Sequence, residues 1–314
     1  MIEHAIVVVN PACHGGRGWK RWLLIKDKVK QKLGVPVTEL VSEKGSLLGE
    51  TLLPLLQDAR PSCIISAGGD GSLHTLVNAL LKAKDEKSKA IPIGAVGLGS
   101  SNDFLKPFQH FIQGIPVRID LSRPYQQQDT GRAVYGDADN GLQETYFIVN
   151  ASFGATAEGN WRFNHPGPLL RWLKKHATGL AISHTALSTI LRFTNKPVFI
   201  RFNEEERQVQ LSNINLIKSP FISGTLHYTQ PILPDDGQLG LNICTAMNRF
   251  ELLQTLYGLE KGRFDESPAR LSVFTKSFSL SSDEPVVFEC DGETVMAKHV
   301  SITVMPKALT LLGQ

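Results

Sequence analysis

The sequence predicts an α/β plus β fold, with an N-terminal open parallel α/β domain and a second, mainly antiparallel β-sandwich domain. Short apolar runs alternate with helical periodicity through residue 105, as in a parallel sheet covered by helices. From Pro116–Leu121 onward, apolar residues alternate with a period of two, which indicates antiparallel strands. The length of 314 residues exceeds one typical hydrophobic core. We therefore expect domains at residues 1–121 and 122–304, with the tail 305–314 packing back on the first.

Apolar runs in the first domain are expected to form buried parallel strands, most of which lead through a polar loop into a helix. The strands are expected at residues 6–9, 35–41, 63–65 and 91–96. The helices are expected where apolar residues recur every three or four positions, over residues 22–33, 47–56 and 73–81. Pro54 interrupts the second of these helical stripes, and it predicts a kink or an early helix end there.

The second domain is expected to consist mainly of strands and hairpins, with helices over residues 169–193 and near 249–259. Hairpin turns are expected at Asp139–Gly141 and Asn203–Glu205, where turn-forming residues separate two strand patterns. The strands are expected at residues 145–150, 197–202, 209–217, 239–245, 271–280, 286–289 and 298–305.

The composition argues against several classes of protein. Lys plus Arg number 33 against 30 Asp plus Glu, so the net charge of +3 provides no strong field for nucleic acid. The 4 cysteines include no Cys-x-x-Cys pair, which argues against a zinc knuckle and a disulfide framework. The first residues lack a signal-peptide pattern, and no apolar run reaches the ~20 residues of a membrane span. These features predict a soluble, cytoplasmic protein.

The stretch Ser66–Ser72 follows a buried strand and precedes the clearest helical pattern in the chain. Its glycines let backbone N–H groups approach an anion, and the N-terminus of the next helix adds a partial positive charge. The turn is therefore a candidate phosphate cradle. Asp70 would repel a phosphate unless a divalent cation or a sugar hydroxyl lies between them, which suggests a metal-bearing nucleotide. The alternative is a tight turn in which Asp70 makes a local Asx hydrogen bond.

Two further polar loops, residues 10–18 and 97–104, also follow expected strands. The first lacks the lysine and the spacing of a P-loop, so taken alone it is equally well explained as a surface turn. The carboxyl ends of parallel strands line one crevice, where ligands bind in open α/β sheets. We therefore expect all three loops at one edge of the sheet.

Four motifs follow one another along the chain, namely Gly68–Ser72, Gly99–Phe104, Pro234–Gly237 and Asp291–Glu293. In this order and over nearly the whole chain, they resemble the diacylglycerol-kinase catalytic family, which includes bacterial lipid kinases and is related to sphingosine and ceramide kinases. The resemblance implies the two-domain plan shared with NAD kinases, although the Gly99–Phe104 segment resembles the lipid-kinase pattern G-T-x-N-D-[FL] and argues against an NAD kinase. It also implies an ATP-dependent kinase that uses Mg²⁺ and acts in lipid metabolism and phospholipid biosynthesis.

The resemblance implies a nucleotide-binding set in the first domain. Asn10–His14 resembles the family's N-P-x-S-G loop, Ser42–Gly45 resembles its T-x-x-G segment, and Gly68–His74 corresponds to the triphosphate loop. The first loop departs from the pattern, because Cys13 and His14 replace the usual Ser-Gly. The expected nucleotide-binding residues are Asn10, Pro11, Ala12, Cys13, His14, Ser42, Gly68, Gly69, Asp70, Gly71, Ser72, Leu73, His74, Gly99, Ser100, Asn102 and Asp103.

Two further roles are implied for the second domain. Glu293 matches the family's proton acceptor, and with Asp70 it makes up the expected catalytic residues. Asp236, with backbone carbonyls near Leu233 and Gln238, matches a structural magnesium site of bacterial members. A carboxylate within hydrogen-bond reach of an acceptor alcohol can take its proton as the new bond forms. From the residues alone, a plain turn with Glu293 in solvent is the favoured interpretation of Asp291–Glu293, and Pro234–Gly237 has the same ambiguity; only their register with the other motifs favours function.

The residues leave open which molecule accepts the phosphoryl group. Trp161–Arg162 and Arg171–His176 mix bulky rings with cations, which suits transient contact with the inner face of an anionic membrane. A helix that packs Trp172 inward is an equal alternative. Three hypotheses remain: a kinase for a lipid alcohol such as diacylglycerol, a kinase for a sphingoid base or small soluble alcohol, and a non-catalytic nucleotide- or lipid-binding protein. No nucleic-acid partner is expected, and a homodimer stays an open alternative.

Overall fold

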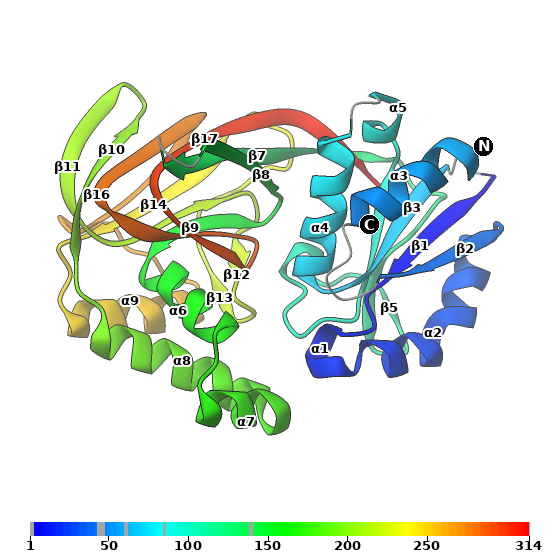
Figure 1. Ribbon diagram of the computed structural model, residues 1–314, viewed down its shortest axis with the longest axis horizontal. Helices are drawn as coiled ribbons and strands as arrows, with labels where there is room; N and C mark the ends of the chain where they lie inside the picture. The colour runs from blue at the N-terminus through cyan, green and yellow to red at the C-terminus, as the bar shows by residue number, and fades with distance from the viewer. Residues whose placement is uncertain (1–2, 43–47, 60–61, 84–85, 138–140, 314) are drawn as a thin grey trace. The chain divides into compact units, whose positions relative to one another are not determined.

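The computed structural model describes residues 3–42, 48–59, 62–83, 86–137 and 141–313. The chain forms two compact units, one of residues 1–130 and 306–314 and the other of residues 131–305 (Figure 1). Strands β7 (Gln126–Asp137) and β17 (Glu293–Leu311) each begin in one unit and end in the other. The sequence analysis places the first boundary at residue 121 and the returning tail at 305–314.

The first unit is built on parallel strands in the order β4-β3-β1-β2, with registered pairs throughout. Strands β1, β3 and β4 are buried at every residue, as continuous apolar runs predict for a sheet covered on both faces. Antiparallel β6 pairs with β4, and the end of β17 pairs in parallel with the start of β4 through Leu311 and Ile93. The strand bounds are β1 Ala5–Val9, β2 Val37–Val41, β3 Cys63–Gly68, β4 Ile93–Gly97, β5 Phe111–Ile112 and β6 Ile115–Arg118.

Helices cover both faces of this sheet. Helix α2 buries Trp22, Ile25, Val29 and Leu33 against the sheet, which are the four residues of the predicted stripe. Helices α3 and α4 lie together on the opposite face (Figure 1). The helix bounds are α1 Cys13–Gly16, α2 Gly18–Leu33, α3 Leu48–Ala59, α4 Asp70–Leu81, α5 Glu86–Lys89 and the 3₁₀ turn η1 Asp103–Leu105.

The predicted early end at Pro54 is wrong, because α3 continues through Pro54 to Ala59. Leu52 and Leu56 are buried on either side of the proline. Apolar packing on both sides of Pro54 therefore outweighs the loss of one backbone hydrogen bond in the helix.

The second unit is an antiparallel β structure whose strands run in the order β15-β14-β11-β10-β16-β17. The long strands β11 and β16 each contain a register shift. The residues that follow the shift in each strand also pair with β9. Apolar residues from these strands form one core, which includes Phe153, Leu241 and Phe288. Helices α6, α7, α8 and α9 pack against one another (Figure 1).

The remaining elements complete this unit. Their bounds are β8 Gly141–Phe147, β9 Asn150–Gly154, α6 Ala155–Asn164, α7 Pro168–His176, α8 Thr178–Arg192, β10 Lys196–Phe202, β11 Glu205–Ile217, β12 Phe221–Ile222, β13 Leu226–His227, β14 Leu239–Thr245, α9 Arg249–Glu260, β15 Arg270–Thr275 and β16 Ser277–Cys290. The structure therefore confirms the α/β plus antiparallel β fold class.

Several predicted boundaries in this unit need correction. The strand expected at 145–150 is divided between β8 and β9, and that expected at 271–280 is divided between β15 and β16 at Lys276. The helical segment 169–193 is two helices, because Ala177 has non-helical angles of φ −149° and ψ 71°. The hairpin at Asn203–Glu205 is confirmed, with φ of 46° and 66° at Asn203 and Glu204. The hairpin expected at Asp139–Gly141 lies mostly outside the described residues.

Candidate active site

The predicted phosphate cradle lies at the junction of β3 and α4. Gly69 is the N-cap and Asp70 the first residue of α4, so the unsatisfied N–H groups of the first helical turn point toward this loop. Side chains would not fit here, because a Cβ on Gly68 would lie 2.2 Å from the Ser72 hydroxyl oxygen. A Cβ on Gly99 would lie 2.5 Å from Gly69 Cα. The glycine loops after β3 and β4 thus meet backbone to backbone.

Hydrogen bonds join the same two loops. The Gly68 carbonyl accepts from the N–H groups of Leu98 (2.7 Å) and Gly99 (3.1 Å). Asp70 Oδ1 accepts from the N–H of Phe104 at 3.1 Å. This partner is 34 residues away, so the bond ties two loops together and is not a local Asx bond. Whether the Asp70 carboxylate also meets a metal-bound nucleotide stays a prediction.

Asn102 shapes the loop after β4 from within. It adopts a left-handed conformation with φ of 51°, which Asn tolerates better than most residues. Its Oδ1 accepts from Gly99 N–H at 3.1 Å, and its Nδ2 donates to the carbonyls of Gly97 and Gly99, both at 3.2 Å. The neighbouring Asp103 is buried and pairs with Lys106 Nζ at 2.7 Å. Both predicted residues therefore serve the loop's own structure.

Asn10 connects the first loop to the cradle. It directly follows β1, and its Nδ2 donates to the Ser72 hydroxyl at 2.8 Å while its Oδ1 accepts from Ala12 N–H at 3.0 Å. Ser42, after β2, donates its hydroxyl to the Val9 carbonyl at 3.2 Å. Residues 43–45 of the expected T-x-x-G match lie outside the described residues. The structure therefore gathers the ends of β1, β3 and β4 at one edge of the sheet, as predicted.

Cys13 and His14 depart from the family's loop pattern, and the structure indicates the protonation of both side chains. Burial raises the pKa of the Cys13 thiol to about 11, so it is a neutral thiol at physiological pH. Desolvation, followed by the charges of Arg21 and Arg17, lowers the pKa of His14, which favours the neutral imidazole. His14 Nδ1 is buried and has no hydrogen-bond partner within the described part of the chain.

Other predicted residues take different positions. Leu73 and His74 are buried, His74 Nε2 lies 3.3 Å from Asn78 Nδ2, and the Leu73 N–H donates to the Gly69 carbonyl at 3.1 Å. The side chain of Ser100 is exposed. Pro11 and Ala12 form the turn that precedes α1.

Sequence reasoning missed Arg21. From the first turn of α2 its Nη1 donates to the carbonyls of Leu98 (2.7 Å) and Gly99 (2.9 Å), so a guanidinium lies at the glycine loops. A fixed positive charge beside these loops favours a polyanionic ligand. The only signal in the sequence is a basic residue three positions after Gly18, which alone has no meaning.

In the second unit, the predicted Asp291–Glu293 motif is the turn between β16 and β17. Asp291 and Gly292 have φ of 46° and 93°, and Cys290 pairs with Glu293 across the hairpin. The Asp291 carboxylate is buried and accepts from the N–H groups of residues 148, 149 and 150, at 2.9, 2.9 and 3.0 Å. Glu293 is exposed at the first position of β17. Asp291 therefore anchors the turn that presents Glu293 to solvent.

Glu289 is a second residue that sequence reasoning missed. Its side chain is 1% exposed within β16, and its carboxylate accepts from Asn150 Nδ2 at 3.0 Å, from the Ser152 hydroxyl and from Gly292 N–H at 2.5 Å. Burial raises its pKa to about 7, the charge of Asp291 adds to this, and the three hydrogen bonds oppose it. A lone Glu at the end of the apolar run 286–288 was the available signal.

Glu289 makes the free energy of unfolding depend on pH. Its pKa in the folded protein, about 7, exceeds its ordinary value of 4.5, so the folded state holds this proton more tightly. The stability that the proton contributes is complete below about pH 4.5 and is lost as pH rises to 7, a loss of a few kcal/mol. We expect Glu289→Gln, measured by urea unfolding from pH 5 to 8, to abolish this fall. The exposed Glu284→Gln is the control, and parallel profiles for wild type and Glu289→Gln would contradict the assignment.

The predicted magnesium site contains a cation from the chain itself. The Lys218 side chain is 0% exposed, and its Nζ donates to Asp236 Oδ1 and to the Gln238 carbonyl, both at 2.8 Å. Leu233 has an exposed side chain. Among the described residues, no group of three or more His, Cys, Asp or Glu side chains is arranged to hold a metal ion. An ammonium thus contacts two of the three expected magnesium ligands.

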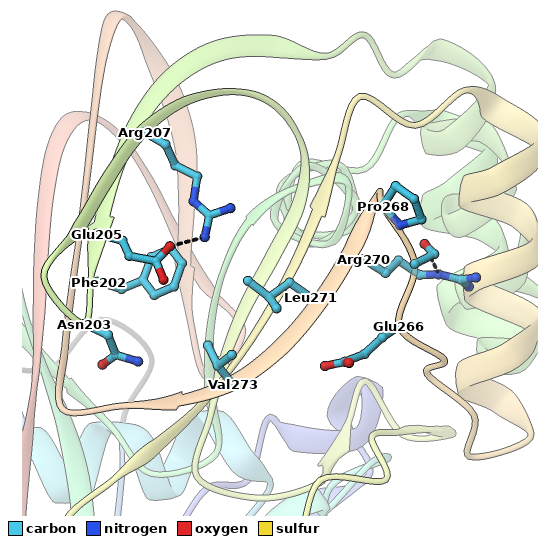
Figure 2. A pocket seen from close by; sticks show the side chains of 10 residues that line it. Phe202, Asn203, Glu205, Arg207, Glu266, Pro268, Arg270, Leu271 and Val273 are labelled. Carbon is cyan, nitrogen blue, oxygen red and sulfur yellow. Dashed lines mark hydrogen bonds and ion pairs between the residues drawn. The ribbon is translucent and has the colours of Figure 1, made fainter.

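A surface pocket of about 570 Å³ lies elsewhere in the second unit, at the β10–β11 hairpin and β15 (Figure 2). Its charged residues include Arg207, which pairs with Glu205, as Figure 2 shows. It contains none of the predicted site residues, and its Glu205 and Arg207 side chains pair with each other. The candidate site residues are therefore the glycine loops of the first unit and, described separately, the acidic hairpin of the second unit.

The fold defines a class of two-domain protein, with a parallel α/β domain and a mainly antiparallel β domain. Residues 4–122 match the diacylglycerol kinase catalytic domain, and residues 154–313 match the YegS C-terminal NAD kinase beta sandwich-like domain. The chain belongs to the family of diacylglycerol kinases and YegS-like lipid kinases. The resemblance inferred from the four motifs is thereby confirmed.

Individual relatives are distant but span most of the chain. A diacylglycerol kinase of Staphylococcus carnosus is 24% identical over 307 residues, which cover 93% of this chain and 89% of the relative. A probable lipid kinase YegS-like of Xanthomonas oryzae pv. oryzae is 25% identical over 258 residues, covering 79% and 77%. A crystal structure of a diacylglycerol kinase from Bacillus anthracis str. Sterne superimposes with a TM-score of 0.67 at 15% identity, covering 100% of this chain and 97% of that one.

Proposed function

We propose that this protein is an ATP-dependent lipid kinase that transfers the γ-phosphate to the hydroxyl of a lipid alcohol, diacylglycerol or a close relative. The observation that carries the proposal is the junction of the two glycine loops, where Gly69 and Gly99 meet without side chains. Backbone donors, the α4 N-terminus and Arg21 there favour a triphosphate. Phosphoryl transfer asks a protein mainly to hold and neutralise a triphosphate and to orient the acceptor.

In this proposal the first unit binds the nucleotide. The loop after β1, the Gly68–Ser72 turn and the Gly99–Asp103 loop contact the phosphates through backbone N–H groups. A Mg²⁺ ion bound to ATP supplies charge neutralisation, and Asp70 is the residue placed to hold it. The Asp70 bond to Phe104 N–H keeps the carboxylate fixed between the two loops. ATP and Mg²⁺ therefore enter as one substrate.

The second unit supplies the proton acceptor in this proposal. Glu293 is exposed at the start of β17, where an alcohol can reach it, and Asp291 and Glu289 hold the turn that presents it. As a general base, Glu293 takes the acceptor hydroxyl's proton during attack on the γ-phosphorus. The product is a phosphate monoester of the lipid, and ADP leaves with its magnesium.

We further propose that α7 rests on an anionic membrane surface. Leu169 and Trp172 are 59% and 58% exposed, so the alternative in which Trp172 packs inward is wrong. Arg171 and Lys175 are exposed on the same short helix. None of the helices in the described part of the chain is long and apolar enough to cross a bilayer. A transient contact from the cytoplasmic side suits this mixture of rings and cations.

Trp172→Ala tests the membrane contact. We expect the fraction bound to phosphatidylglycerol vesicles in a sedimentation assay to fall on the order of tenfold, because a buried aromatic ring contributes about 1.5–3 kcal/mol. Phe199→Ala, which removes an aromatic ring that is 46% exposed on β10, is the matched control. Equal binding by the two variants would show that α7 is not the membrane surface.

The proposed reaction is tested by incubating the protein with γ-labelled ATP, Mg²⁺ and a panel of acceptors. Diacylglycerol, ceramide, sphingosine and NAD are supplied separately, and the products are resolved by thin-layer chromatography. Label in a phosphorylated diacylglycerol supports the proposal. Label only in sphingosine or NAD supports the second hypothesis, and retention of nucleotide binding without any transfer supports the non-catalytic one.

A further inference from the structure

Lys218 stands directly after β11 and fills the loop that carries the expected magnesium ligands. Its Nζ lies 2.8 Å from Asp236 Oδ1 and 2.8 Å from the Gln238 carbonyl oxygen. Asp236 Oδ1 also accepts from Gln238 N–H at 3.1 Å, which closes the turn over Gly237, where φ is 70°. The side chain of Lys218 is 0% exposed and that of Asp236 is 18% exposed. A cation therefore already lies inside this loop.

An ammonium group and a divalent ion make the same demand on a protein, because each is satisfied only by oxygen atoms. A buried lysine is rare unless it is paired, since its desolvation must be offset by its partners. The 2.8 Å separations are hydrogen-bond distances, whereas Mg²⁺ holds oxygens at about 2.0–2.1 Å in an octahedron. A second cation beside Nζ would meet an ammonium at close range. The residues present therefore suit Lys218 and do not suit a resident metal ion.

The ion pair is connected to the acidic hairpin of the same unit. The Val149 carbonyl accepts from the N–H of Lys218 at 2.8 Å, and Val149 N–H donates to Asp291 Oδ1 at 2.9 Å. One short segment thus connects the Lys218 backbone with the carboxylate that anchors the Asp291–Gly292 turn. Loss of the Lys218–Asp236 pair is expected to loosen the structure around this segment.

We propose that the Lys218 ammonium is the resident cation of the 233–238 loop, in place of the structural Mg²⁺ that its family implies, and that the folded protein needs no divalent ion there. The proposal concerns the folded state and does not depend on which acceptor is phosphorylated. The divalent cation requirement of the protein is then confined to the ion that accompanies the nucleotide.

The test is thermal unfolding without nucleotide, in EDTA and in millimolar Mg²⁺. Wild type is expected to melt at the same temperature in both, and titration calorimetry with Mg²⁺ is expected to give no heat of binding. Mg²⁺-dependent stabilisation that Asp236→Asn abolishes would overturn the proposal, because it would place the ion at this loop.

Variants of Lys218 and Asp236 provide a second, independent test of the proposal. Lys218→Met keeps the length of the side chain but leaves Asp236 unpaired, so we expect the melting temperature to fall on the order of 10 °C. Lys30→Met, which removes a partly exposed pair with Glu39, is the control and should change less. The double variant Lys218→Met/Asp236→Leu is expected to recover most of the loss, and it also serves if the single variant fails to fold. A double variant no more stable than Lys218→Met would contradict the ion-pair role.

Discussion

Glu293→Gln is expected to lower turnover about 10²- to 10⁴-fold while ATP affinity stays unchanged, the range typical of a lost general base. Glutamine keeps the shape of the side chain but cannot accept the proton of the attacking hydroxyl. The fold should be unaffected, since Glu293 is exposed and the turn is held by Asp291. Turnover is measured by label transfer to lipid, and ATP affinity by calorimetry on the same preparation.

The matched control is Glu284→Gln, an exposed glutamate in neighbouring β16, for which no loss is expected. A loss below about tenfold for Glu293→Gln, on the order of 1.4 kcal/mol, would point to a solvated hairpin carboxylate. The proton acceptor would then have to be another group. The Asp103 carboxylate is a poor replacement as it stands, because it is buried and paired with Lys106.

Asp70→Asn is expected to reduce transfer on the order of 10²- to 10³-fold, through the loss of several kcal/mol of charge stabilisation by the nucleotide-bound metal ion. Two substitutions can separate the role of Asp70 in holding the metal ion from its role in tying the two loops together. Asn can still accept from Phe104 N–H, whereas Ala removes both the charge and the bond that ties the two loops. We therefore expect Asp70→Asn to melt like wild type and Asp70→Ala to melt lower, with transfer strongly reduced in both.

Asp27→Asn, on the exposed face of α2, controls for the general effect of losing one carboxylate. Turnover near the wild-type level in Asp70→Asn would end the metal–nucleotide assignment and leave Asp70 as a tie between loops. A fall in melting temperature alone, without a loss of turnover, would lead to the same conclusion.

Much of the first unit could be predicted from sequence because its signals are local. Continuous apolar runs mark β1, β3 and β4, and the 3.6-residue stripe of α2 matches its buried face. Strand β7 was missed because its sequence is polar, yet Gln128, Asp129 and Thr130 are buried in it. Asp129, for example, accepts from Lys307 N–H at 2.8 Å, a partner 178 residues away. Only the tertiary fold makes such a segment a strand.

The residues of the candidate site also fall into those that local sequence predicts and those that it does not. The glycine turns and the acidic hairpin were visible, because glycine and turn chemistry are local properties of the sequence. Arg21, Glu289 and Lys218 were missed, since each acquires its role from distant partners. Arg21 meets a carbonyl 77 residues away, and Lys218 is fully buried although lysine usually lies at the surface. Sequence gives the position of such charged residues but not their burial.

The most direct test of the central claim follows one phosphorus atom. The protein is incubated with Mg²⁺ and diacylglycerol in mixed micelles, with either γ-labelled or α-labelled ATP, and the reaction is extracted with chloroform. We predict that label from γ-labelled ATP enters the organic phase as a phosphorylated lipid and that label from α-labelled ATP stays in water. Glu293→Gln is expected to lower the transfer about 10²- to 10⁴-fold. Folded protein that binds ATP and micelles but leaves all γ label in the aqueous phase would contradict the assignment as a lipid kinase.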